Sequence, residues 1–171
     1  MDLEGNKQKN ILVTGGAGFI GSHLVDLLIN KNFEVRVIDN LSGGRIENLN
    51  RHKHNKKLIF KKMDINKISL NEKIFKNVKY VFHLAGKGDI VPSIENPLSY
   101  METNVMGTTR VLENCKNKKI SKFIYAASSS CYGIAKTPTK ENHKISTKYP
   151  YALSKYLGEL TCLHWAKVYS L

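Results

Sequence analysis

The segment LVTGGAGFIGSHL constrains the fold most, because it sets four glycines between an apolar run and an amphipathic stretch. Gly15, Gly16, Gly18 and Gly21 fall where a strand would end and a helix would begin. Glycines there allow a tight turn, a close approach of the backbone to a pyrophosphate, and close packing of the helix on the strand. The N–H groups that open the helix would then face the phosphates. The segment therefore predicts a strand–turn–helix unit that binds a dinucleotide.

Short apolar runs alternate with amphipathic stretches along the rest of the chain. We expect strands over 10–16, 34–39, 57–62, 80–85 and 122–128, and helices over 19–31, 67–76, 98–118 and 150–169. Strands that alternate with helices form βαβ units, in which the strands are parallel and helices cover both faces of the sheet. The predicted fold is α/β, a Rossmann-like doubly wound parallel sheet in one domain over residues 1–171.

Composition and charge narrow the class of protein. With 42% hydrophobic and 24% charged residues the chain is typical of a globular protein. No apolar run could cross a bilayer, and the polar first ten residues lack the apolar core of a secretion signal, so we expect no membrane partner and a cytoplasmic location. Cys115, Cys131 and Cys162 follow no metal-ligand spacing, which predicts reduced thiols and no metal.

The net charge of +13 leaves a second class of function open. A basic chain can bind nucleic acid, and its densest basic run lies at 51–62. That run has almost no aromatic residues between its lysines, which favours a solvated surface over a polyanion site. We therefore expect no nucleic-acid partner, and keep nucleic-acid binding as the weaker alternative.

Asp39 ends the second expected strand, eighteen residues after Gly21. An acid at this place accepts hydrogen bonds from the ribose hydroxyls of an adenosine. A carboxylate there also repels the 2′-phosphate of NADP, so the sequence predicts NAD as the cofactor. Arg45 follows closely and could bind that phosphate, which keeps NADP as the weaker alternative.

Tyr151 and Lys155 stand four residues apart, so they project from one face of the last expected helix. The ammonium favours the ionised phenol, which can remove a proton from a sugar hydroxyl while hydride leaves the same carbon for a nicotinamide. A serine after the fifth strand would hold the substrate oxygen. The Tyr/Lys spacing alone is common on helices, so the prediction depends on its combination with the serines and the glycine segment.

Together these segments resemble the extended short-chain dehydrogenase/reductases, and among them the NAD-dependent epimerase/dehydratase family. The matching segments are, in chain order, TGGAGFIGSHL, VIDNLSGGR, MDI, HLAG, NVMGTTRVLE, SSSCYG and YALSK. The resemblance implies that the catalytic residues are Ser128, Tyr151 and Lys155, and that the substrate is contacted by Ser128, Ser129 and Ser130. It implies a cofactor site formed by Gly15, Gly18, Phe19, Ile20, Gly21, Asp39, Asn40, Leu41, Ser42, Gly43, Asp64, Ile65, Leu84, Ala85, Gly86, Lys87, Asn104, Tyr151 and Lys155.

The same resemblance narrows the reaction. Sugar 4,6-dehydratases of this family carry Asp-Glu directly after the catalytic serine or threonine, where this chain has Ser129 and Ser130. Hydroxyls cannot replace the acid and base that elimination of water needs. The triple serine is similar instead to C4-epimerases of UDP-hexoses. The implied function is NAD-dependent epimerisation of a nucleotide sugar through a 4-keto intermediate.

Family members continue beyond the Tyr/Lys helix into further strands and a domain that binds the nucleotide sugar. We therefore expect this chain to be an N-terminal part, truncated after that helix, that binds NAD but is poorly active alone. The resemblance also implies a homodimer, paired through the helices at 98–118 and 150–169. Two alternatives stay open: another nucleotide-sugar dehydrogenase or reductase of the family, and a non-catalytic NAD-binding sensor module.

Overall fold

The fold is a five-stranded sheet in a computed structural model that describes residues 10–171. The strands are β1 (Asn10–Thr14), β2 (Glu34–Asp39), β3 (Leu58–Lys62), β4 (Val78–His83) and β5 (Lys122–Tyr125). They pair in the order β3-β2-β1-β4-β5, and every pair is parallel. This confirms the predicted Rossmann-like α/β fold. Residues 1–9, which carry most of the polar segment without a secretion signal, lie outside the described residues.

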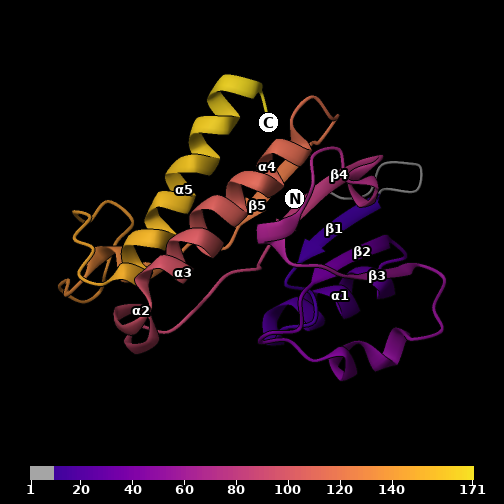
Figure 1. The fold of residues 1–171 in the computed structure, drawn as a ribbon, viewed down its shortest axis with the longest axis horizontal. Coiled ribbons are helices and arrows are strands. Elements are labelled where there is room, and N and C mark those ends of the chain that lie inside the picture. The colour runs from indigo at the N-terminus through magenta and orange to yellow at the C-terminus, as the bar shows by residue number, and fades with distance from the viewer. Residues whose placement is uncertain (1–9) are drawn as a thin grey trace.

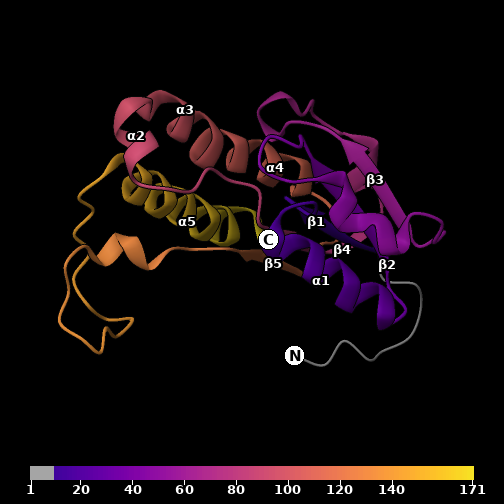
Figure 2. The same ribbon diagram turned by 90° about the horizontal axis from the view of Figure 1, so that it is seen from below.

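The helices cover both faces of the sheet. They are α1 (Phe19–Asn30), α2 (Val91–Glu95), α3 (Pro97–Met101), α4 (Thr108–Cys115) and α5 (Pro150–Tyr169). Side chains of α1 pack on one face and those of α4 on the other, while α5 lies alongside α4 (Figure 1). The turned view shows α2 and the loop before α5 at one end of the molecule, beyond the sheet (Figure 2). No helix among residues 10–171 is long and apolar enough to cross a membrane.

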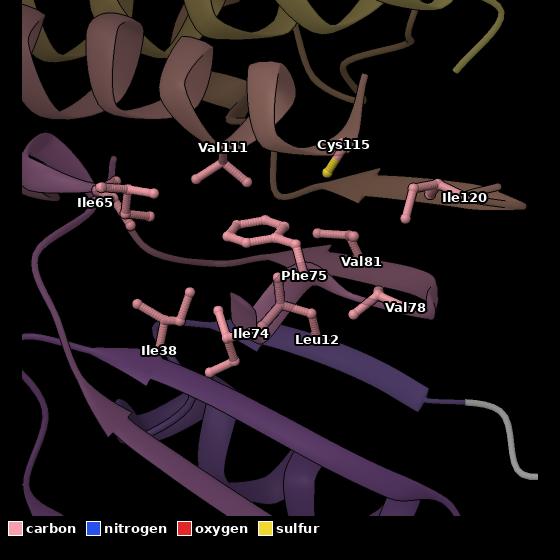
Figure 3. Close-up of a cluster of buried hydrophobic side chains, with 11 residues drawn as sticks. Leu12, Ile38, Ile65, Ile74, Phe75, Val78, Val81, Val111, Cys115 and Ile120 are labelled. Carbon is pink, nitrogen blue, oxygen red and sulfur yellow. The ribbon is translucent and has the colours of Figure 1, made fainter. Parts of the chain in front are cut away.

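Two layers of apolar side chains enclose the sheet, which explains why its strands are apolar at successive positions. Ile11 and Val13 point toward α1, whereas Leu12 points toward α4, because neighbouring side chains of a strand face opposite sides. On the α4 side, Phe75 is fully buried and lies between Val111 and the strands (Figure 3). These layers hold the carboxyl ends of the strands in place.

The strand order reverses between β1 and β4. The chain runs outward through β2 and β3, then crosses to the other side of β1 to form β4 and β5. At such a point the connections after the two neighbouring strands leave in opposite directions, and a crevice opens at their carboxyl ends. Gly15, after β1, and Leu84, after β4, lie at this crevice.

The prediction of a helix over 67–76 is wrong. The structure has two short 3₁₀ turns there, η2 (Ile65–Lys67) and η3 (Lys73–Phe75). Asn71, between them, has a φ of 60°, which a helix does not allow. The Glu72 N–H donates to the Asn114 side chain at 2.9 Å instead of to a helical carbonyl. A contact with α4 therefore replaces local helical bonding.

The helix predicted over 98–118 is interrupted. A π-helical turn, η4 (Glu102–Gly107), joins α3 to α4, and α4 ends at Cys115, shortly before Asn117 with its φ of 58°. Gly107 packs closely on η2, since a Cβ there would lie 2.8 Å from the Ile65 side chain. Further 3₁₀ turns that the sequence did not predict are η1 (Ile46–His52) and η5 (Ser129–Tyr132).

Candidate active site

The glycine turn between β1 and α1 forms the floor of the crevice. Gly15 has a φ of 71°, and a Cβ there would lie 2.7 Å from the Ala85 nitrogen, so both its conformation and its neighbours require glycine. A Cβ on Gly21 would overlap the turn itself, 2.8 Å from the Gly16 Cα. Gly18 differs: its φ is −73°, and an added Cβ would meet only the Gly15 oxygen, at 3.3 Å. The space over Gly18 belongs to the cleft.

A cleft of about 460 Å³ extends from this turn across the ends of β2, β3 and β4. It brings together twelve of the predicted cofactor residues: Gly15, Gly18, Asp39, Asn40, Ser42, Gly43, Asp64, Ile65, Leu84, Ala85, Gly86 and Lys87. Phe19 and Ile20 lie outside its lining, with 80% and 68% of their surface exposed in the first turn of α1. Gly21, Leu41, Asn104, Tyr151 and Lys155 also lie outside the lining of the cleft.

The cleft has lining residues that sequence reasoning missed: Ile38, Gly44, Met63, Asn66, Ser99, Glu102 and Thr103. Met63 and Asn66 flank the predicted pair Asp64 and Ile65. Met63 is the first residue of the MDI motif itself, and extending that motif by one residue toward the C-terminus would have found Asn66. Ser99, Glu102 and Thr103 belong to no motif. They reach the cleft because the π turn, which continues α3, packs against η2.

Asp39 connects the glycine turn to the loop that follows β2. Its carboxylate accepts hydrogen bonds from the Ala17 N–H at 2.9 Å and the Leu41 N–H at 2.8 Å, and the residue is only 7% exposed. Each carboxylate oxygen can accept more than one hydrogen bond, so capacity is left for hydroxyl groups in the cleft. The carboxylate is therefore fixed at the cleft edge before any ligand arrives.

Asn104 lies behind the opposite end of the cleft and supports its wall. Its side-chain oxygen accepts from the Lys87 N–H at 2.7 Å, and its amide donates to the Lys87 carbonyl at 3.0 Å and the Ser154 hydroxyl at 2.9 Å. The residue is 1% exposed. One buried amide thus joins the segment after β4 to the π turn and to α5.

His83, at the end of β4, continues this polar network into the core. The Thr108 hydroxyl uses its proton to donate to the Asn104 carbonyl, so it can only accept from His83 Nε2–H, at 2.9 Å. The other ring nitrogen of this neutral tautomer, Nδ1, then carries no proton and accepts from the Thr14 hydroxyl at 2.6 Å. Thr14 in turn accepts from the Ala85 N–H at 3.2 Å. Burial lowers the pKa of His83 to about 3, so the ring is neutral. His83 is therefore a packed strand residue and not a group that faces the cleft.

The structure brings the three predicted catalytic side chains together at this end. The Tyr151 hydroxyl donates to the Ser128 Oγ at 3.3 Å, which also accepts from the Ser130 N–H at 3.2 Å. Ser129 and Ser130 lie in the η5 turn that Ser128 caps. Lys155, one turn along α5 from Tyr151, is 9% exposed, and burial lowers its pKa to about 8. An added Cβ on Gly86, in the cleft wall, would lie 3.9 Å from its Nζ.

A parallel sheet with a glycine-floored cleft and a Ser/Tyr/Lys set at one end defines a dinucleotide-binding protein of the short-chain dehydrogenase type. The chain belongs to the NAD dependent epimerase/dehydratase family, whose family model matches residues 11–171. NAD is the cofactor of that family. Among the described residues, no group of three or more His, Cys, Asp or Glu side chains could hold a metal ion.

Curated relatives and solved structures agree with this family. UDP-glucose 4-epimerase of Bacillus subtilis is 35% identical, over 91% of this chain and 48% of its own length. UDP-N-acetylglucosamine 4-epimerase of Methanobrevibacter ruminantium, solved with UDP-N-acetylmuramic acid, has a TM-score of 0.90 and 41% identity, over 97% of this chain and 53% of its own. UDP-glucuronic acid 4-epimerase of Bacillus cereus, solved with UDP-glucuronic acid and NAD, has a TM-score of 0.89 and 32% identity. The match covers 95% of this chain and 54% of that enzyme. The chain spans about half the length of these relatives.

Proposed function

We propose that residues 1–171 are the NAD-binding part of a UDP-hexose 4-epimerase. The observation that carries the proposal is the 3.3 Å hydrogen bond from Tyr151 to Ser128, with buried Lys155 one turn away and Gly86 of the cleft wall beside its ammonium. Relatives that share this half of the molecule are named as UDP-sugar 4-epimerases. Ser129 and Ser130 supply no acid for elimination of water, which favours epimerisation over dehydration.

The cleft residues fit NAD, and we assign their roles by place. The backbone at Gly15 and Gly18, with the N–H groups that open α1 at Phe19, Ile20 and Gly21, would hold the pyrophosphate. Residues 39–43 would hold the adenosine ribose, and Asp64 and Ile65 the adenine. Residues 84–87 would line the nicotinamide, with Asn104 behind them. Because the Asp39 carboxylate repels a 2′-phosphate, the chain should bind NAD⁺ more tightly than NADP⁺ in calorimetry.

Each catalytic side chain has one task in this scheme. Held by the residues named above, bound NAD would supply the acceptor and donor of the hydride at C4 of the sugar. Tyr151 takes the proton of the C4 hydroxyl as oxidation proceeds and gives it back on reduction. Ser128 donates to the C4 oxygen, and the Lys155 ammonium favours the ionised phenol and binds the nicotinamide ribose. One base serves both directions, as epimerisation requires.

The test joins this chain to the C-terminal half of the Methanobrevibacter ruminantium epimerase, and NMR then follows appearance of the C4 epimer from UDP-glucose or UDP-N-acetylglucosamine. Tyr151→Phe should reduce turnover by a factor of about 100 or more and leave NAD⁺ affinity nearly unchanged, because only the base is lost. Ser128→Ala should reduce turnover by a smaller factor. Near-normal turnover by Tyr151→Phe would contradict the mechanism.

We also propose that the protein acts in the cytoplasm as a homodimer. Cys115, Cys131 and Cys162 are all free thiols, which suits a reducing compartment. Exposed apolar side chains occur on α5, at Leu160, Leu163 and Val168, and on the π turn, at Met106. They offer a surface for a second α4/α5 pair related by a two-fold axis. Sedimentation at tens of micromolar should give a dimer, and Leu163→Glu should give a monomer.

A further inference from the structure

Tyr125, the last residue of β5, makes two contacts with a single residue of α5. Its hydroxyl donates to the backbone carbonyl of Lys155 at 3.1 Å. The centre of its ring lies 4.3 Å from the Lys155 Nζ. The same side chain therefore contacts both the backbone and the ammonium of Lys155.

The ammonium of Lys155 has few other ways to be stabilised. Lys155 is 9% exposed, and within residues 10–171 it forms no ion pair with a carboxylate. Three ionisable groups lie near it: Glu159 and Cys162 on its own helix and His83 on β4. Burial keeps His83 neutral and raises the pKa of the Cys162 thiol to about 12, which leaves Glu159 as the one negative charge among them near neutral pH. The negative face of an aromatic ring attracts a cation, and more strongly where water is excluded.

The surrounding structure is shaped to keep Tyr125 in this place. A Cβ on Gly158 would overlap the Tyr125 hydroxyl and lie 2.7 Å from the Asn104 carbonyl, so only glycine lets α5 approach both. The His83 ring also packs against it, with the two ring centres 5.8 Å apart. Burial also raises the pKa of Tyr125 above its ordinary range, so its hydroxyl remains a donor.

We propose that Tyr125 is a positioning residue for Lys155: its hydroxyl fixes α5 at that residue, and its ring face holds the ammonium beside Gly86 at the end of the cleft. The importance of Lys155 rests on the proposed function. The contacts themselves involve only this chain and can be tested without cofactor or sugar.

The test is an NMR titration of the 171-residue chain with ¹³C/¹⁵N-labelled lysine, in which Lys155→Arg identifies the Lys155 signal. Tyr125→Leu should lower the pKa of Lys155 by about one pH unit, because an attraction specific to the charged form is lost. Tyr125→Phe keeps the ring and should leave the pKa within about 0.3 of the original. As a control, Tyr169→Leu removes a ring that lies 4.1 Å from the ammonium of Lys116, and should leave Lys155 unchanged.

An unchanged or higher pKa in Tyr125→Leu would overturn the proposal, as would an equal fall in Tyr125→Phe. If the leucine variant does not fold, the phenylalanine variant still decides, because a shift of about half a pH unit or more would show that the ring is not what matters. Calorimetry provides the second measurement: Tyr125→Leu should weaken NAD⁺ binding about tenfold and Tyr125→Phe less than about threefold. If the original chain binds no NAD⁺, the proposed function fails, while the titration still decides the role of Tyr125.

Discussion

The glycines of the turn between β1 and α1 have different structural roles, although they belong to one motif. Gly15 and Gly21 are required by the fold itself, one by its positive φ and one by its contact with the turn. Gly18 has ordinary backbone angles and faces the cleft. A side chain at Gly18 would touch only the Gly15 oxygen, at 3.3 Å, and would extend into the cleft where a ligand would lie.

Gly18→Val should fold almost as well as the original chain and lose NAD⁺ binding, because its side chain fills the place of the pyrophosphate. Gly21→Val is the matched control, and it should prevent folding, since its Cβ overlaps the turn. Circular dichroism melting and NAD⁺ calorimetry on both variants separate the two effects. Normal NAD⁺ affinity in Gly18→Val would show that the phosphates do not lie over this turn.

Lys155 should reduce the stability of the fold near neutral pH. Its pKa falls from 10.5 to about 8 on burial, so between these values the unfolded chain binds more protons than the folded one. The free energy of unfolding should therefore rise with pH across that window, and the full destabilisation by the buried ammonium is present below pH 8. Lys155→Met should raise the free energy of unfolding by about 1–3 kcal/mol at pH 7 and by much less at pH 10. Urea denaturation at both pH values tests this, with exposed Lys167→Met as a control that should change little at either.

At the scale of elements, the π turn η4 connects both ends of the cleft. Thr103 accepts from the Asn66 amide at 3.1 Å, and Asn104 accepts from the Lys87 N–H after β4. Thr108, the first residue of α4 directly after the turn, bonds to His83. The sequence could not predict this turn, because 98–118 has helical periodicity throughout. The interruption depends on partners at 65–66 and 83, which only the folded sheet brings near. The strands were predictable because burial on both faces makes them apolar.

Thr108→Val should destabilise the fold by about 1–3 kcal/mol, because it leaves the His83 Nε2–H without an acceptor in the core. Thr109→Val is its matched control: the neighbouring threonine donates to the Val105 carbonyl at 2.9 Å but is only half-buried, so water can replace the bond. That variant should change stability by less than about 0.5 kcal/mol. Urea denaturation compares the two. Equal losses of unfolding free energy in the two variants would show that the buried hydrogen bond between Thr108 and His83 contributes nothing to stability.

At the scale of the whole molecule, the sequence predicted twelve residues that the structure brings together in one cleft, but it did not predict the choice of sugar. Gly15, Asp39, Tyr151 and Lys155 stand at spacings that their chemistry explains, whereas the choice of Ser128 among the three serines came from the resemblance to the family. The choice of sugar depends on side chains that must contact the sugar nucleotide, and no motif in this half encodes them. β5, which ends at Tyr125 shortly before Ser128, lies at an edge of the five-stranded sheet, where a further strand could pair.

The 171-residue chain should therefore bind NAD⁺ yet convert almost no UDP-glucose, while the same chain joined to the C-terminal half of the Methanobrevibacter ruminantium epimerase should epimerise a UDP-hexose. Hydride transfer needs the sugar C4 within about 3–3.5 Å of the acceptor carbon. Binding energy from the remote UDP group holds it there, and we expect those contacts from the other half. NMR of the sugar nucleotide compares both proteins, with Tyr151→Phe in the fusion as the inactive control. Robust conversion by the 171-residue chain alone would mean that the site is already complete within this half.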